Sequence, residues 1–311
     1  MGPVQPGEVF YINFNRRLIM WINTTGIVQD HLIILGTLTN PVYLIKGKDE
    51  YILVESGVTR DAPTILSQLK EHVSDLSLIK HWFITHSHYD HCGTIESLYP
   101  YFRNVQLYAS EYAVSNFRNE KYVKKIRQLN ALISDQEITG FPADLQQIPF
   151  ITVKDNDIIE TDSGIWQILY TPGHSQCSVS LYHKESDTLF VSDALGEIIG
   201  HEKWFPLAFD HVEKFVESIN RLNTLHPQTI ALGHNGILTG SDARLAPEHS
   251  LRGYHETLQF ISELQHTLSH EQLIDEICKK FKVMDHSFIS DKVYRKSIEM
   301  LLFNLKTESI L

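Results

Sequence analysis

The sequence predicts an α/β protein that ends in a helical appendage. Short runs rich in β-branched residues come in two clusters, and each cluster is followed by a segment whose apolar residues have helical spacing. From about residue 247 the pattern becomes helical and polar up to the last residue. We therefore expect a main α/β domain over residues 1–245 and a C-terminal helical appendage over residues 246–311.

The composition is that of an ordinary globular protein. The chain has 311 residues, of which 42% are hydrophobic and 21% charged, and this length suffices for one large domain with an appendage. The net charge of -11 disfavours nucleic acid as a partner, since nucleic-acid binders need a basic face. No run reaches the roughly eighteen apolar residues that a membrane helix requires. Three scattered cysteines fit a reducing cytoplasm.

The first half of the chain reads as a β-meander followed by alternating helices and strands. Residues 1–30 contain Gly and Pro punctuation between short apolar runs, which predicts a leading β-hairpin. Asp61 is a plausible N-cap for a helix with Pro63 in its first turn. The predicted strands are 31–35, 42–45, 51–54, 81–85 and 105–109, and the predicted helices are 63–72, 95–99 and 111–134.

The second half repeats the order of strands and then helices. Residues 212–225 place apolar side chains at helical spacing, so this helix should face the core. The C-terminal helices also carry apolar stripes, which must pack in the core, cover an active site or form a dimer surface. The predicted strands are 148–151, 157–159, 165–170, 179–182, 188–191 and, last, 229–232, and the C-terminal helices are 247–268, 271–281 and 290–305.

The stretch from Thr85 to Gly93 has the density of a metal site. It places three histidines and an aspartate within six residues, directly after an apolar strand. Residues two apart in an extended chain point the same way, so His86 and His88 can reach one point. Asp90 and His91 follow at a turn and can reach a second point. One strand end therefore offers ligands for two metal ions.

Three further strands end in a candidate ligand. His174 lies in a Pro-Gly turn after one strand, Asp193 follows the next, and His234 follows the last, each beside a glycine. A single histidine or aspartate at a strand end is most often no ligand at all. A histidine cluster followed along the chain by a strand-end His, Asp and His, in this order, is much more specific for a metal site.

At these positions the chain resembles the metallo-β-lactamase superfamily, over roughly residues 30 to 240. The resemblance implies a four-layer αβ/βα sandwich of two mixed β-sheets with the site at one edge. It places His86, His88 and His174 on a first metal and Asp90, His91 and His234 on a second, with Asp193 bridging both. The bridging Asp differs from the Cys of zinc β-lactamases, and His88 differs from the Glu of the oxygen-reducing branch.

The donor set implies a binuclear hydrolase. Imidazoles and carboxylates without thiolate suit iron or zinc, and also manganese. Two divalent ions about 3.5–4 Å apart would bring the pKa of a shared water near neutrality and supply a bridging hydroxide. Asp90 is the expected catalytic residue, because it would orient this hydroxide and pass a proton to the leaving group.

Residues 85–93, 191–197 and 204–210, together with the C-terminal helices, resemble the branch that hydrolyses 2-aminobenzoylacetyl-CoA in bacterial alkyl-quinolone signal biosynthesis, and thus in quorum sensing. This resemblance implies C-terminal helices that cover the active site and a metal centre that tolerates iron. We expect a cytoplasmic thioesterase that cleaves an acyl- or aroylacetyl-CoA thioester. The pocket candidates are Tyr89, Glu197, Ser287 and Tyr294, for each of which simple packing is the alternative.

Other functions use the same fold and stay open. A phosphodiesterase or nuclease would want a basic exosite, which the acidic balance disfavours, and a lactonase would be separable by its substrates. A third alternative is a regulatory protein with vestigial activity that binds a protein partner through the appendage. The same helices could instead form a homodimer.

Overall fold

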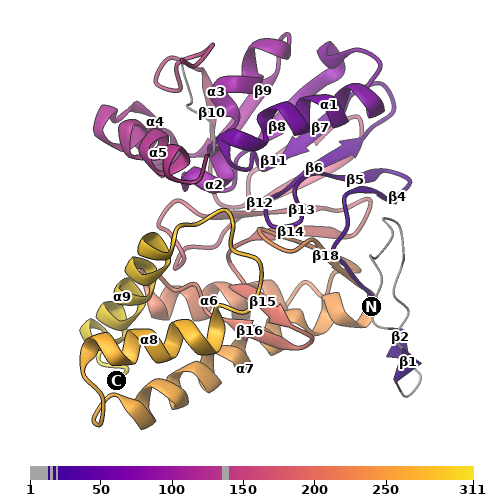
Figure 1. Ribbon diagram of the computed structural model, residues 1–311. Coiled ribbons are helices and arrows are strands. Elements are labelled where there is room, and N and C mark those ends of the chain that lie inside the picture. Colours follow the sequence, from indigo (N-terminus) through magenta and orange to yellow (C-terminus); the bar gives the residue numbers. More distant parts are fainter. Residues whose placement is uncertain (1–12, 15–16, 19, 135–139) are drawn as a thin grey trace, which may run out of the picture.

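Two seven-stranded β-sheets lie face to face with helices on the outer side of each (Figure 1). The computed structural model describes residues 13–14, 17–18, 20–134 and 140–311. The architecture confirms the predicted four-layer sandwich of two mixed sheets.

The first sheet has the strand order β10-β9-β8-β7-β6-β5-β4. Strands β7 to β10 run parallel, and β4 to β7 form an antiparallel meander, of which β5 to β7 were predicted. Its strands are β4 (Gly26–Gln29), β5 (Leu32–Gly36), β6 (Pro41–Lys46), β7 (Tyr51–Val54), β8 (Ile79–Phe83), β9 (Gln106–Ser110) and β10 (Phe150–Val153). The helices on this side are α1 (Ala62–His72), α2 (Tyr89–Cys92), α3 (Ile95–Leu98), α4 (Glu111–Arg118) and α5 (Glu120–Leu132).

The second sheet has the order β11-β12-β13-β14-β17-β18-β3. Here β14 and β17 run parallel and the other neighbouring pairs are antiparallel. Its strands are β3 (Met20–Ile22), β11 (Ile158–Thr161), β12 (Gly164–Tyr170), β13 (Val179–His183), β14 (Thr188–Ser192), β17 (Thr229–Leu232) and β18 (Ile237–Thr239). Helices α6 (Val212–Asn223) and α7 (Gly240–Leu264) cover its outer face. Two small hairpins are β1 (Asn13–Phe14) with β2 (Arg17–Leu18), and β15 (Glu197–Gly200) with β16 (Lys203–Phe205).

Side-chain alternation divides the core into layers. On β5, Leu32 and Ile34 pack between the two sheets, whereas Ile33 and Leu35 pack against the helices of the first sheet. Successive residues of a strand point to opposite faces, and both faces of this strand are covered, so the run is apolar throughout.

The C-terminal helices α8 (His270–Phe281) and α9 (Asp291–Thr307) extend the layer outside the second sheet. Their apolar sides join the same core as α6 and α7. We call the connection between them, residues 282–290, the strap. In Figure 1 the strap rises from the lower helices to the boundary between the two halves. Helix α7 begins at Gly240, so it runs across the predicted domain boundary at residue 245.

Several sequence predictions of elements were wrong in detail. The single helix predicted over 111–134 is two helices, because the side chain of Asn119 caps a new helix through the amides of Lys121 and Tyr122. Strand 229–232 is not the last, since β18 follows it, and the short strands β4, β15 and β16 were missed. The predicted leading hairpin is present as β1 and β2, while residues 1–12 lie outside the described residues.

Within the described ranges, no helix combines the length and apolar character needed to cross a membrane.

Candidate metal centre

Seven strand-end side chains meet at one edge of the sandwich. Four of them follow β8 in the first sheet, and the other three follow β12, β14 and β17 in the second. Because these strands end at the same edge, residues far apart in sequence converge there. They are His86, His88, Asp90, His91, His174, Asp193 and His234, the set predicted from the sequence.

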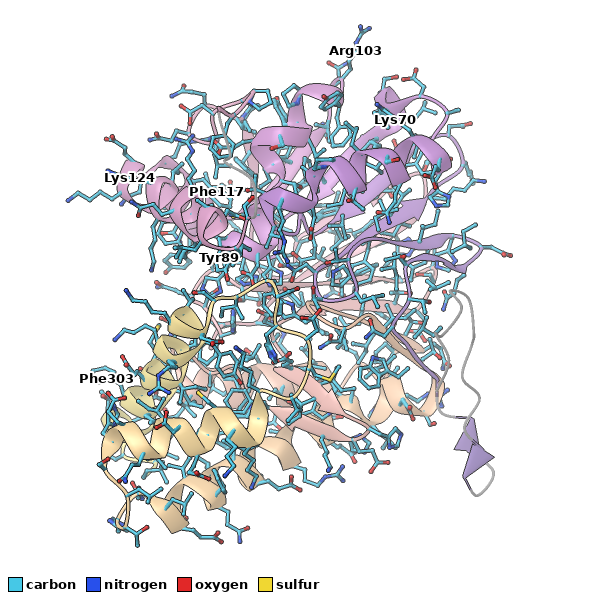
Figure 2. The ribbon with its side chains drawn as sticks, in the orientation of Figure 1. Lys70, Tyr89, Arg103, Phe117, Lys124 and Phe303 are labelled. Carbon is cyan, nitrogen blue, oxygen red and sulfur yellow. The ribbon has the colours of Figure 1, made fainter. Side chains whose placement is uncertain are left out.

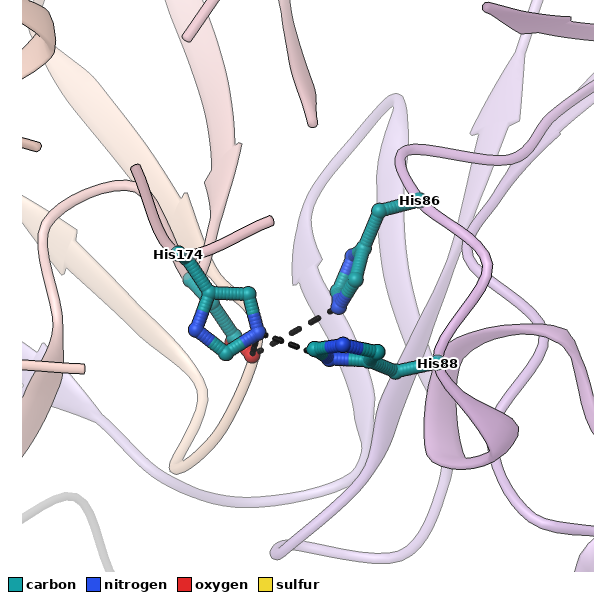
Figure 3. Close-up of side chains that lie close together, drawn as sticks. His86, His88 and His174 are labelled. Carbon is teal, nitrogen blue, oxygen red and sulfur yellow. Dashed lines mark hydrogen bonds and ion pairs between the residues drawn. The ribbon is translucent and has the colours of Figure 1, made fainter. Parts of the chain in front are cut away.

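The seven residues form two adjoining groups. In the first, one ligand atom from each of His86, His88, His174 and Asp193 lies within 4.8 Å of the others, and Asp90, His91 and His234 form the second. Figure 3 shows the three imidazoles of the first group pointing toward one another, with Nε2 of His174 2.8 Å from Nδ1 of His88.

Asp193 lies between the two groups. Its Oδ2 is 3.1 Å from Nε2 of His174 and 3.4 Å from Nε2 of His91. Its Oδ1 is 3.6 Å from Nε2 of His234. Oδ2 therefore lies beside histidines of both groups, and Oδ1 lies beside the second group, so this carboxylate could serve both.

The polar atoms of this centre are poorly satisfied by the protein itself. Nε2 of His86, Nε2 of His91 and Oδ1 of Asp193 are buried and have no hydrogen-bond partner within the described part of the chain. Leaving such a group unpaired costs about 1–3 kcal/mol. A divalent cation would satisfy these atoms, so the residues present fit a metal site.

Hydrogen bonds on the outer side hold three imidazoles in a ligating orientation. Nδ1 of His174 lies 2.9 Å from the carbonyl of Leu207, and Nδ1 of His234 lies 2.6 Å from the carbonyl of Thr39. A carbonyl can only accept, so each Nδ1 carries the proton and each Nε2 presents a lone pair to the centre. Nδ1 of His91 likewise lies 3.2 Å from Oε2 of Glu55.

Burial favours the neutral form of the first-group histidines. It lowers the pKa of His86 and His88 well below the ordinary value, and neighbouring imidazoles lower both further. Burial opposes the charged form of Asp193, yet the imidazoles of His91, His174 and His234 outweigh it and hold its pKa well below the ordinary value. The neutral imidazoles of the first group and the ionised carboxylate are in the protonation states that bind metal. Burial lowers the pKa of His91, but the carboxylates of Asp193 and Glu55 outweigh it and raise this pKa well above its ordinary value, so His91 would release a proton on binding metal.

A buried layer behind the centre was missed at the sequence level. The side chain of Glu55 has only 2% exposure, and its Oε1 accepts a hydrogen bond of 2.8 Å from Thr85. Oγ1 of Thr85 also lies 3.0 Å from the hydroxyl of Ser192, directly before Asp193. A strand end followed by Ser56-Gly57 is the signal that could have identified Glu55, since the other polar residues of the site also follow strands.

The strap packs directly on the centre. The Phe288 ring stacks on His234 with ring centroids 4.3 Å apart, and its carbonyl accepts a hydrogen bond of 2.8 Å from Tyr89 Oη. His286 is buried and lies 3.1 Å from the carboxylate of Glu197. Neither His286 nor Phe288 was predicted, because no periodic pattern marks a connection between helices.

The four predicted pocket residues differ in position. Tyr89, Glu197 and Tyr294 are buried around the strap, and the Tyr294 ring packs edge-on against His286. Ser287 instead is exposed, with its Oγ 3.3 Å from Nη2 of Arg60, and so points away from its buried neighbours. Their role in substrate binding stays a prediction.

The centre opens beside the first ligand group. A hollow of about 410 Å³ is lined by His88 and His174 and passes between α4, α5 and α9. His88 is also the only partly exposed member of its four-residue group. A substrate can therefore reach the first group of ligands without displacing the strap.

Comparison with known proteins gives one family. The sequence profile of the Metallo-beta-lactamase superfamily matches residues 35–234. The probable metallo-hydrolase YflN of Bacillus subtilis is 23% identical over 229 residues, which cover 65% of this chain and 83% of that protein. The human acyl-coenzyme A thioesterase MBLAC2 is 24% identical over 215 residues, which cover 63% of this chain and 71% of the relative.

A solved structure shares the fold over most of its length. The metallo-beta-lactamase family protein TTHA1429 of Thermus thermophilus has a TM-score of 0.60 and 20% sequence identity, and the match covers 92% of each chain. At this identity the likeness shows the fold alone.

Proposed function

Because this chain belongs to the metallo-beta-lactamase superfamily, we propose that it is a metal-dependent hydrolase that cleaves acyl- or aroylacetyl-CoA thioesters. The observation that carries the hydrolase is the convergence of seven ligand-type side chains, six of them buried, beside an open hollow. The thioesterase named among the relatives, MBLAC2, supports the choice of substrate class. The sequence resemblance to the branch acting on 2-aminobenzoylacetyl-CoA supports an aroylacetyl group.

The donor set suits a pair of divalent ions. The two adjoining groups contain five imidazoles and two carboxylates and no thiolate, which suits iron, zinc or manganese. When bound, such ions polarise a carbonyl oxygen and lower the pKa of water.

The chain's own residues position and protonate the reactants. His88 and His174 line the hollow, so a thioester carbonyl entering there meets the first group. Oδ2 of Asp90 lies 3.8 Å from Nε2 of both His91 and His234. In our proposal this carboxylate takes up a proton from the attacking water and returns it to the departing thiolate.

Aromatic rings close the second group. Phe288 of the strap and Tyr89 of α2 lie there, and both side chains are nearly fully buried. In our proposal the acyl group therefore enters through the hollow at His88 and His174, and the choice of an aroyl group rests on the sequence resemblance. The three free cysteines fit a reducing cytoplasm, where we place the enzyme.

The test is release of free thiol from a panel of aliphatic and aroylacetyl CoA thioesters by metal-replete protein. We expect turnover that prefers aroylacetyl substrates and falls at least about 100-fold in His88→Ala. Metal content by mass spectrometry should fall in the same variant. The control is His266→Ala, which removes an exposed histidine of the α7–α8 connection and should change neither quantity.

Other substrates are the remaining arms of this experiment. Phosphodiesters and lactones are offered to the same metal-replete protein under the same conditions. Turnover of either one, with no thiol released from any thioester, would contradict the thioesterase proposal and keep the hydrolase.

A further inference from the structure

A groove continues from the metal centre along helix α9. The hollow at His88 and His174 shares Phe209, Asp210 and Met300 with a second hollow of about 610 Å³. The second hollow follows α9 toward its C-terminal end. The two hollows therefore form one groove, which we call the α9 groove.

The lining of the α9 groove changes along its length. Near the centre it offers hydrogen-bonding side chains, among them Asn116 and Gln176. Farther out it is apolar, because Met300 and Phe303 are 44% and 67% exposed. Figure 2 shows Phe303 projecting outward from α9. Exposed apolar side chains beside a hollow indicate a binding surface.

The outer part of the α9 groove also carries cations. Lys296 and Lys306 line it, together with Glu299, which forms an ion pair of 2.5 Å with Lys296. Lys306 is exposed and has no ion pair in the part of the chain that the structure describes. Helix α9 contains four basic and two acidic residues, although the whole chain has a net charge of -11.

We propose that the α9 groove binds the CoA portion of the thioester substrate. This inference rests on the proposed thioesterase function and names the part of the protein that selects the thiol. A pantetheine arm is long and narrow, with amides and a dimethyl carbon, which match the polar inner part and the apolar outer part. Its phosphates reach Lys296 and Lys306, whose ammonium groups attract anions.

The competing occupant is a second copy of the chain, docked on Met300 and Phe303. The exposed Lys306, which has no ion pair among the described residues, favours an anionic ligand over an apolar protein face. Asp210 and Glu299 also line the groove, and Glu299 already pairs with Lys296. The experiment below distinguishes the two.

The test compares one acyl group on two thiols. The acyl group is offered as its CoA thioester and as its N-acetylcysteamine thioester, which lacks the phosphates. We measure KM for each thioester and take the ratio of KM for the CoA thioester to KM for the truncated thioester. In the double variant Lys296→Glu/Lys306→Glu we expect this ratio to rise about tenfold or more, which corresponds to about 1.4 kcal/mol or more.

The matched control is Lys70→Glu/Arg103→Glu. It changes the net charge equally, and both side chains are exposed at the opposite end of the molecule, as Figure 2 shows. We expect no change in the KM ratio. An equal rise of the KM ratio in this control would mean that the net charge of the whole protein, and not the groove, favours the CoA thioester. That result would overturn the proposal.

A binding measurement separates failure of the groove from failure of the thioesterase. Isothermal titration of the metal-replete protein with S-ethyl-CoA, which cannot be hydrolysed, should show binding that weakens in the groove variant. If thioesters are hydrolysed but neither the KM ratio nor this affinity changes, the groove is wrong and the thioesterase stands. If S-ethyl-CoA binds but no thioester is hydrolysed, the proposed function fails and the groove stands.

Sedimentation of Phe303→Glu tests the second copy. If the wild type is a dimer, and this variant is a monomer whose KM for the CoA thioester is unchanged, the face belongs to a protein contact and the proposal is overturned. A wild-type monomer leaves the groove free for substrate and supports it.

Discussion

At the scale of single residues, Glu55 explains why His91 can serve the metal centre. Its carboxylate lies 3.2 Å from Nδ1 of His91 and accepts from Thr85 on its other oxygen. It adopts a positive φ of 72°, which directs the chain away from β7 just behind the site. Backbone in this region costs about 1–3 kcal/mol and persists only where surrounding contacts impose it. We infer that Glu55 is a positioning residue.

The variant Glu55→Gln tests this role. Outer partners of metal-ligating histidines typically contribute 10–100-fold to metal affinity, and we expect a loss of about that size. Competition with a chelating dye measures it. A matched control is Glu50→Gln, because Glu50 forms a similar pair with His81, 3.3 Å apart and away from the seven ligands. Equal losses in the two variants would mean that any buried histidine–glutamate pair matters alike, and Glu55 would have no special role.

At the scale of elements, the connection between β12 and β13 depends on Gly173, which packs against α6. Its φ is 126°, and a Cβ there would lie 2.3 Å from the backbone of Phe215 on α6. Its carbonyl also accepts from the amides of Asp210 and His211, both at 3.0 Å. Since His174 is the next residue, this packing fixes where the ligand emerges.

The variant Gly173→Ala should therefore destabilise the fold and weaken metal binding together. Overpacking costs about 1–3 kcal/mol in addition to the cost of the positive φ. The control Gly26→Ala has a similar φ of 111° but no atom within 4 Å of the added Cβ, so it measures the φ cost alone. Denaturant unfolding gives the free energy of unfolding of both variants. Equal losses of this free energy in Gly173→Ala and Gly26→Ala would show that the close approach to α6 is irrelevant.

The contribution of the strap to stability depends on pH, and the pKa of His286 gives the direction of this dependence. Burial lowers the pKa of His286, but its hydrogen bond to Glu197 and the charge of that carboxylate outweigh it, so the pKa is raised. The nearby Lys282 opposes this and Tyr294 packs against the ring. A raised folded-state pKa gives stability that is present below the unfolded value of about 6.5 and lost as pH rises through the folded value.

We expect His286→Gln to lower Tm most near pH 6 and least near pH 9, at saturating metal. Thermal unfolding across this range measures the difference from the wild type. His81→Gln is the contrasting control, because burial lowers the pKa of His81 and its contribution fades toward low pH instead. A deficit for His286→Gln that grows with pH would contradict the charged pair with Glu197.

The elements show which parts of the fold a sequence can predict. Long periodic segments such as 212–225 were predicted within two residues of the observed helix. The start of α7 was missed because Pro247 suggested a first turn, whereas it lies inside the helix. The strap could not be predicted, since its contact between Tyr89 and Phe288 joins residues 199 positions apart and leaves no local pattern.

At the scale of the whole molecule, the ligand set joins the two halves of the sandwich. One strand end of the first sheet supplies four of the seven residues, and three strand ends of the second sheet supply the rest. The sequence could predict that these seven side chains converge, because each follows an apolar strand, and their role as ligands stays a prediction. The groove along α9 and the strap depend instead on how the C-terminal helices pack, which side-chain patterns alone do not determine.

Because the candidate ligands come from both halves, removal of a bound metal should destabilise the whole fold. A metal that binds only the native state adds about 2.7 kcal/mol to the free energy of unfolding when its free concentration is about 100 times Kd. Chelation removes this amount. We expect Tm to fall on dialysis against chelator and to recover when metal is restored. His234→Ala, which removes a second-sheet ligand, should start with a lower Tm and respond little to chelator, whereas His266→Ala should respond like the wild type. The contradicting result is an unchanged wild-type Tm after complete metal loss, which mass spectrometry verifies. The two sheets would then hold this edge together by themselves, and metal bound by the seven side chains would not link the two halves.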